Sequence, residues 1–293
     1  MDRSRWLAVV AVVGAVAVVI GASIFTLRKV EPSSKRGDAV TAPVASQPIP
    51  PTAGEPAQAQ QQRVPVNTLL ANAETARAAG AYREAQQLYQ QVIQSNPNTQ
   101  AAATAQQRLG EVSVQLLLSP AAPSSEENYT VQPGDTLSKI AQEGGVTIDL
   151  LRSANGLQGD LIRVGQTLRV PKVQFSVIVD KSQNTLTLKS AEDVLKVYRC
   201  STGQGGVTPT GQFKIVTRLV NPVWKGVVAA EDPENPLGTR WLGFDLPEYG
   251  IHGTNEPETV GQPVTKGCIR LLNSDVEELF TLLPEGTPVT IVE

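Results

Sequence analysis

Residues 249–273 read YGIHGTNEPETVGQPVTKGCIRLLN and contain the only histidine of the chain, His252, and one of its two cysteines, Cys268. A cysteine thiolate is a strong nucleophile, but a free thiol with a pKa of about 8.5 is mostly protonated at neutral pH. A nearby imidazole can accept that proton and later return one to a leaving amine. The segment is therefore consistent with Cys268 as a nucleophile and His252 as its base, with structural roles for both residues as the alternative.

The residues next to this pair fit an acyl-transfer site. Gly253 follows the histidine and Gly267 precedes the cysteine, so a substrate can approach the backbone closely at both points. The N–H groups of Lys266, Gly267 and Cys268 are candidates for an oxyanion hole. Cys200 ends an expected strand, and we interpret it as a small buried residue, with a second catalytic thiol as the alternative.

Residues 174–293, which contain this segment, alternate short β-rich runs with turn residues. Strands are expected at Phe175–Val179, Thr185–Lys189, Val194–Tyr198, Gly211–Val216 and Thr287–Val292. One helix is expected near the C-terminus, capped by Asn273 or Ser274 and closed by Pro284–Gly286.

Motifs across this whole region resemble the L,D-transpeptidase catalytic (YkuD-like) family. The hallmark of that family is His-Gly-Thr, a loop, and Ser/Thr-x-Gly-Cys-Ile-Arg, which correspond here to residues 252–254 and 265–270. Three upstream motifs also match: Ser201-Thr202-Gly203, Thr208-Pro209-Thr210-Gly211-x-Phe213 and Asn221-Pro222-x-Trp224. The resemblance implies a mainly β sandwich catalytic domain. Many members have histidine where Lys266 stands, so this position is not expected to be essential.

The resemblance also implies a reaction on peptidoglycan stem tetrapeptides. Cys268 would attack the carbonyl of the third residue, a diamino acid, and expel D-alanine. A side-chain amine of a neighbouring stem would then take the acyl group and cross-link the wall. His252 would be base and acid, oriented by a main-chain carbonyl such as that of Gly253. Thr265 and Arg270 would shape the site or meet substrate carboxylates, with a structural ion pair as the alternative for Arg270.

Neither a cofactor nor a metal is implied, and three other functions were considered. Water could resolve the same acyl-enzyme, which would make the chain an L,D-carboxypeptidase, and the sequence leaves this open. A non-catalytic wall-binding scaffold is a further alternative, against which the intact His252–Cys268 motif argues. A D,D-transpeptidase of the penicillin-binding type needs Ser-x-x-Lys, and no serine of the chain has that spacing.

Residues 129–172 form a separate small module with expected strands at Tyr129–Val131 and Thr167–Val170 and two short helices between them. The segments YTVQPGDTLSKIA, ANG and GQTLRVP resemble a lysin motif (LysM) along its whole length. The resemblance implies a βααβ fold that binds glycans containing N-acetylglucosamine. The candidate glycan-binding residues are Gly134, Asp135, Thr136, Asn155 and Gly156.

Residues 67–118 are rich in Ala and Gln, which favour helix. Gly80 and Pro97 interrupt the pattern, and Asn98 or Thr99 starts a third segment. The stretch GAYREAQQLYQQVIQSNPN resembles part of one tetratricopeptide repeat, whereas solenoids need about three repeats. We expect a TPR-like helical hairpin that acts as a spacer or dimer contact, with a partner-binding groove as the alternative.

The remaining segments indicate an envelope protein. Residues 6–27 carry no charge and are long enough to span a bilayer core of about 30 Å, so residues 1–29 are expected to be a membrane anchor, with a cleaved signal peptide as the alternative. Residues 30–66 and 119–128 are expected to be linkers. The net charge of -3 does not indicate a nucleic-acid protein. The expected chemistry places residues 30–293 outside the cytoplasmic membrane, in the periplasm or cell wall.

Overall fold

Four stretches are described in the computed structural model: residues 65–120, 128–226, 228–229 and 232–293. The expected anchor at 1–29 and all but the end of the linker at 30–66 lie outside the described residues, as do residues 121–127 of the second linker. Within the described part of the chain, no helix combines the length and apolar character needed to cross a membrane.

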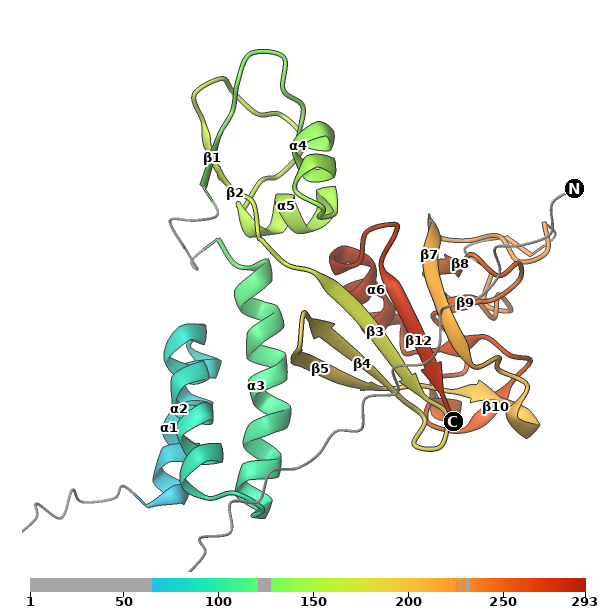
Figure 1. Cartoon of the computed structure of the whole chain (residues 1–293), viewed down its shortest axis with the longest axis horizontal. Coiled ribbons are helices and arrows are strands. Elements are labelled where there is room, and N and C mark those ends of the chain that lie inside the picture. Colours follow the sequence, from blue (N-terminus) through green and yellow to red (C-terminus); the bar gives the residue numbers. More distant parts are fainter. Residues whose placement is uncertain (1–64, 121–127, 227, 230–231) are drawn as a thin grey trace, which may run out of the picture. The chain divides into compact units, whose positions relative to one another are not determined.

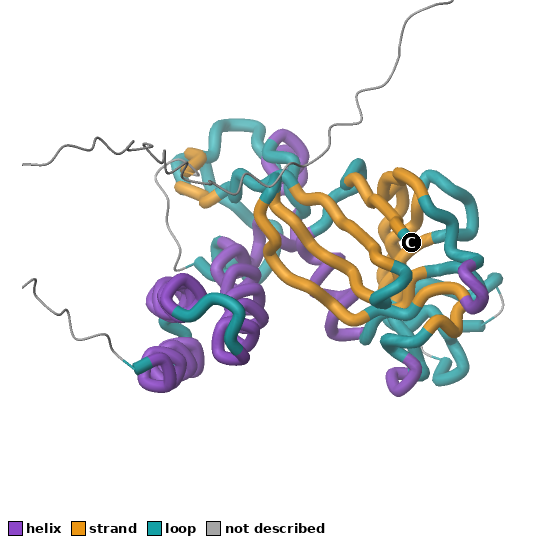
Figure 2. The backbone as a smooth tube through the Cα atoms, turned by 60° about the horizontal axis from the view of Figure 1, so that its bottom comes forward, coloured by secondary structure: helices purple, strands orange, loops and turns teal. Residues whose placement is uncertain are grey.

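The C-terminal domain is built on one eight-stranded sheet with the order β11-β9-β8-β7-β12-β3-β4-β5. Figure 1 labels most of these strands, and Figure 2 shows strands in orange. The bounds are β3 Phe175–Asp180, β4 Thr185–Ser190, β5 Asp193–Arg199, β7 Gly211–Val220, β8 Arg240–Phe244, β9 Gly250–His252, β11 Ile269–Arg270 and β12 Pro288–Val292. The strands β6 Thr202–Gly203 and β10 Pro263–Thr265 form a separate parallel pair. The domain is β-rich, as expected, but its main strands join in one sheet rather than in two sheets of similar size.

Alternating burial explains the central strands. In β3 the inward side chains Phe175, Val177 and Val179 are buried while the intervening residues are half-buried, which is the period of two expected for a strand. All five strands expected from the sequence are present, with ends that differ by up to four residues. The strands β6, β8, β9, β10 and β11, of two to five residues each, were not predicted.

One helix, α6 (Asn273–Leu282), packs against β8 and β9. Its buried residues are Val276, Leu279, Phe280 and Leu282. The prediction that Asn273 or Ser274 caps this helix is wrong. The N-cap residue is Leu272, which makes no side-chain capping bond, because the side chain of Asn273 is used elsewhere in the site.

The LysM segment has the expected βααβ order: β1 Asn128–Thr130, α4 Leu137–Glu143, α5 Ile148–Ala154 and β2 Thr167–Arg169. The two strands pair in antiparallel fashion. Thr136 and Thr147 cap the two helices by accepting hydrogen bonds from backbone N–H groups three residues later. Leu150, Leu151 and Leu168 form a buried centre.

The N-terminal described segment has three helices, α1 Val66–Ala78, α2 Tyr82–Ser95 and α3 Gln100–Leu118, so the helical prediction is confirmed. Gly80 ends α1 with a positive φ of 74°, and the Thr99 hydroxyl caps α3. Helix α3 also packs against β5 of the C-terminal domain. A Cβ at Gly110 would lie 2.7 Å from the carbonyl oxygen of Leu195, so the helix needs glycine at this contact.

Candidate active site

The register of two short parallel strands brings the predicted nucleophile and base close together. Strand β9 pairs with β11 so that Ile251 faces Ile269 and His252 faces Arg270. Cys268 immediately precedes β11 and is therefore level with Gly250. His252 lies two positions further along the neighbouring strand, on the same side of the pleat. The fifteen residues between the two in sequence form the loop that makes this approach possible.

His252 is a buried, backbone-oriented imidazole. Its Nδ1 lies 2.7 Å from the carbonyl oxygen of Gly253. Because a carbonyl only accepts hydrogen bonds, Nδ1 carries the proton in the neutral ring and Nε2 is left as the acceptor. The ring stacks on Trp241 with 5.9 Å between centroids. Burial lowers the pKa of His252 from its ordinary value to about 4, and the Arg270 charge acts in the same direction. The imidazole is thus neutral at physiological pH.

Cys268 is half-buried, and its thiol is also neutral at rest. Its Sγ donates to the carbonyl oxygen of Glu248 over 3.3 Å. The pKa of the Cys268 thiol is raised, mainly by burial and also by the negative charge of Glu248. A hydrogen bond from the Gly250 backbone and the positive charge of Arg270 act in the opposite direction. Among the hydrogen bonds of the described residues, none joins Cys268 to His252. The structure therefore holds a neutral thiol and a neutral imidazole on adjacent strands.

The loop that carries the nucleophile is fixed by threonine hydroxyls. Thr265 Oγ1 donates to the Cys268 carbonyl over 2.7 Å and accepts the Gly267 N–H over 3.1 Å. From the other side, Thr208 Oγ1 donates to the Gly267 carbonyl over 2.9 Å. Thr265 thus shapes the site, and the Gly267 N–H is not free for an oxyanion. The N–H groups of Cys268 and Lys266 remain as candidates.

Gly267 is required for close packing beneath the nucleophile. Its φ of 132° is a conformation that favours glycine, and a Cβ would lie 2.7 Å from a ring carbon of Tyr249. Gly253 is buried, and any side chain there would collide with the amide of Asn273.

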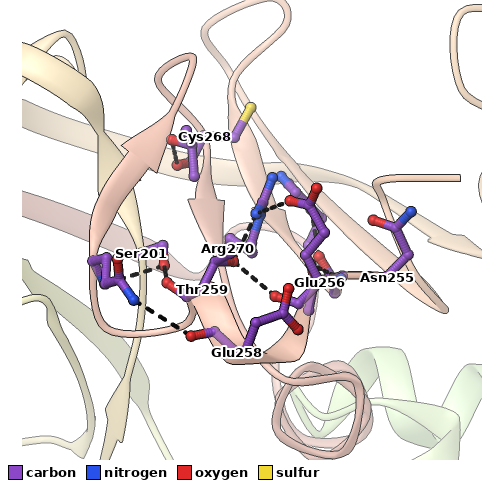
Figure 3. Close-up of polar contacts among 12 residues, drawn as sticks. Ser201, Asn255, Glu256, Glu258, Thr259, Cys268 and Arg270 are labelled. Carbon is purple, nitrogen blue, oxygen red and sulfur yellow. Dashed lines mark hydrogen bonds and ion pairs between the residues drawn. The ribbon is translucent and has the colours of Figure 1, made fainter. Parts of the chain in front are cut away.

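Arg270 makes the ion pair that was one of its two predicted roles. Its Nη1 contacts Glu256 Oε2 and Thr259 Oγ1, both at 2.8 Å (Figure 3). The Thr259 carbonyl in turn accepts the Ser201 hydroxyl over 2.7 Å. Arg270 Nε is buried without a partner among the described residues. The guanidinium thus holds the loop after β9 against β11.

Asn273 is a site residue that sequence reasoning took for a helix cap. Its Oδ1 accepts the N–H groups of Thr254 (3.0 Å) and Thr239 (3.3 Å), and its Nδ2 donates to the Thr254 carbonyl over 2.9 Å. The amide therefore fixes the backbone that directly follows His252 and Gly253. Only its position at the end of the motif-bearing segment, residues 249–273, could have signalled this role.

An open cavity of about 510 Å³ gives access to Cys268. Its described lining residues are Leu219, Pro222, Val223, Trp224, Lys225, Leu237, Trp241, Glu248, Tyr249, Lys266 and Cys268. The walls are mainly apolar, with two lysines and one glutamate. Lys266 lies on the wall with an exposed side chain.

The candidate glycan-binding residues of the LysM segment all have structural roles. Asp135 accepts hydrogen bonds from Tyr129 Oη and the Gln132 N–H. Asn155 bonds to the backbone of Leu151 and to both backbone polar groups of Arg169. The other three form turns and a cap: Gly134 and Gly156 have positive φ, and Thr136 caps α4. The most exposed large apolar residues of the described part of this segment are Leu161 and Val164, in the loop before β2, which sequence reasoning did not select.

Comparison with known proteins gives two family matches. The YkuD family model, which describes the L,D-transpeptidase catalytic domain, matches residues 174–291, and the LysM domain model matches residues 129–171. Neither match reaches the three N-terminal helices.

Two curated relatives carry L,D-transpeptidase YkuD in their names. The protein from Bacillus licheniformis is 36% identical over 171 residues, which cover 56% of this chain and 97% of that protein. The protein from Bacillus subtilis is 38% identical over 171 residues with the same coverage. A solved structure, the L,D-transpeptidase from Mycobacterium smegmatis, is 19% identical with a TM-score of 0.34, covering 45% of this chain and 65% of that one.

Proposed function

Since this chain belongs to the L,D-transpeptidase (YkuD) family, we propose that it cross-links peptidoglycan through a Cys268 acyl-enzyme. The observation that carries this proposal is the placement of Cys268 in the wall of an open cavity, beside the strand that carries a buried, neutral His252. A neutral imidazole with a free Nε2 is the form that can accept a thiol proton.

The first half-reaction forms a thioester. A stem tetrapeptide in the cavity presents the carbonyl of its third residue to Cys268 Sγ. The thiol proton passes to His252 Nε2 as the carbon–sulfur bond forms, and His252 returns it to the amine of D-alanine as the carbon–nitrogen bond breaks. Because the thiol now bonds to the Glu248 carbonyl, it must rotate toward His252 when substrate binds. The N–H of Cys268 would stabilise the developing oxyanion.

The second half-reaction consumes the thioester. A side-chain amine of a second stem attacks the acyl carbon and gives its proton to His252, and the sulfur leaves and is protonated again. The walls of the cavity are mainly apolar, which favours contact of an organic acceptor with the acyl group. Hydrolysis, the L,D-carboxypeptidase reaction, uses the same residues, and we favour transfer because of this apolar lining.

Residues 129–171 would hold the enzyme on glycan strands. The family match supports glycan binding, and the exposed Leu161 and Val164 offer apolar surface for sugar rings. Deletion of the module should weaken co-sedimentation of the chain with isolated cell walls. Residues 30–293 would lie outside the cytoplasmic membrane, next to the polymer, with residues 1–29 as the anchor and the helical segment as a spacer or dimer contact.

Release of D-alanine from a soluble tetrapeptide, followed by mass spectrometry of the products, tests the proposal. Wild-type protein should form dimers linked through third residues, and Cys268→Ala should eliminate D-alanine release. Cys200→Ala is the matched control, because Cys200 is fully buried and outside the cavity. Turnover by Cys268→Ala near the wild-type rate would exclude this mechanism.

A further inference from the structure

The turn between β8 and β9 carries a glutamate against the local backbone preference. The Tyr249 N–H donates to the Leu246 carbonyl over 3.2 Å, which closes a four-residue turn with Pro247 second and Glu248 third. Glu248 has a φ of 68°. A left-handed third position after proline favours glycine or asparagine, because a Cβ crowds the backbone there. Glutamate therefore makes this turn less stable than glycine would.

The charge of Glu248 is also unfavourable to the nucleophile. Its carboxylate raises the pKa of the Cys268 thiol and so opposes formation of the thiolate. The hydrogen bond between the two residues uses the backbone carbonyl of Glu248, and any residue at this position would supply that carbonyl. Neither the fold nor thiol activation accounts for the acidic side chain.

The carboxylate is exposed and free to bind a ligand. Among the described residues it forms no hydrogen bond and no ion pair, although Lys225 and Lys266 line the same cavity. It is the only acidic group among the described lining residues. The wall also includes Trp224, whose ring face already holds the Lys225 ammonium at 4.9 Å. An unpaired carboxylate on the wall of the cavity that reaches Cys268 is suited to a primary ammonium.

We propose that Glu248 is the specificity residue that binds a side-chain ammonium of the diamino acid in the substrate. This inference rests on the proposed function, which places such an amine near Cys268. The ammonium belongs either to the donor stem, next to the scissile amide, or to the acceptor stem. Bound substrate would neutralise Glu248 and remove its opposition to the thiolate, so that recognition of the amine also favours the nucleophile.

The donor arm of the test compares two soluble tetrapeptides that end in D-alanine. Their third residue is lysine, with its side-chain amine either free or acetylated. The purified whole chain is compared with Glu248→Gln, which removes the charge and keeps the backbone, and with Glu258→Gln. Glu258 is an exposed acid on the loop after β9 that does not line the cavity, so its variant controls for net charge. The measured quantity is the ratio of kcat/KM for the free-amine peptide to kcat/KM for the acetylated peptide. This ratio should fall roughly tenfold in Glu248→Gln and stay unchanged in Glu258→Gln, because one charge-assisted contact is lost.

The acceptor arm starts from the acetylated donor and measures how the acyl-enzyme divides between an amine acceptor and water. A fall of roughly tenfold in the ratio of transfer to hydrolysis, again in Glu248→Gln only, assigns the ammonium to the acceptor. A third variant, Glu248→Gly, should melt at a higher temperature than wild type while losing the same selectivity, which a purely structural residue would not do.

Loss of selectivity in either arm supports the inference, and unchanged ratios in both arms overturn it while the proposed function stands. A wild-type chain that releases no D-alanine from either donor would overturn both.

Discussion

His252 Nδ1 lies 2.7 Å from the carbonyl oxygen of Gly253, so the next residue in the chain orients the imidazole. A carboxylate in this place would stabilise the imidazolium form. A carbonyl stabilises it less, and burial opposes it, so the pKa of His252 falls to about 4. Together with the raised pKa of Cys268, this makes the resting pair neutral rather than a thiolate–imidazolium ion pair.

The stability of the fold should therefore depend on His252 at acidic pH. An unfolded histidine gains its proton near pH 6.5, whereas the folded one does so only near pH 4, so between these values the unfolded state binds more protons. The free energy of unfolding should fall as pH drops through this range, by roughly 3 kcal/mol from this group. Urea unfolding at pH 7 and pH 4.5 measures the loss.

His252→Gln isolates that loss, because the chain has no other histidine and its carboxylates titrate equally in both proteins. The variant should lose less stability than wild type between the two pH values. Parallel losses would mean that the folded imidazole titrates near its ordinary value.

Alkylation by iodoacetamide should report the neutral pair at Cys268. Because burial raises the pKa of this thiol, its alkylation rate should keep rising with pH from 6 to 9. Cys200, buried with its pKa raised to about 12, should react only after unfolding. Mass spectrometry of the labelled protein separates the two sites. A rate at Cys268 that is constant between pH 6 and 8 would instead indicate a preformed thiolate.

Local signals were sufficient for much of the fold. A run of β-branched and aromatic residues predicted β3, in which every second side chain is buried. Contacts between distant segments were not predictable in this way. Asn273 has the residue type of a cap, yet its amide binds Thr239 and Thr254 because β8 and the loop after β9 meet at the start of α6.

The same limit applies to the sites. Sequence motifs identified Cys268 and His252, but the role of Glu248 depends on a turn conformation and on a cavity built from several strands. In the LysM segment, Asp135 and Asn155 were candidate glycan-binding residues because of the resemblance to the lysin motif. The sequence did not predict that their side chains also bond to backbone groups of the module.

Asn273→Ala should reduce both stability and activity. It leaves the N–H groups of Thr239 and Thr254 without their acceptor, a cost of about 2 kcal/mol in the free energy of unfolding. The backbone after His252 would also be less well held, so kcat for D-alanine release should fall roughly tenfold. Ser274→Ala is the control, since Ser274 is exposed, and it should change stability by less than about 0.5 kcal/mol. Equal effects of the two variants would contradict this role of Asn273.

The ion pair between Arg270 and Glu256 should be measurable in a double-mutant cycle. The Arg270 side chain is 11% exposed and that of Glu256 is 53% exposed, so solvent screens the pair in part. We expect a coupling free energy of about 0.5–1 kcal/mol from urea unfolding of Arg270→Met, Glu256→Gln and the double variant. Strictly additive effects would show that the two charges do not interact in solution.

Gly110→Ala tests whether α3 packs on the catalytic domain. At an exposed position inside a helix, alanine in place of glycine stabilises by about 1 kcal/mol. Here the new Cβ would lie 2.7 Å from the Leu195 carbonyl oxygen and 3.3 Å from the Lys196 Cα, both backbone atoms that cannot rotate away. Steric overlap should outweigh helix propensity, and the variant should be destabilised by about 1–3 kcal/mol. Differential scanning calorimetry measures the sign directly, and a melting temperature above that of wild type would show that α3 does not contact β5 in solution.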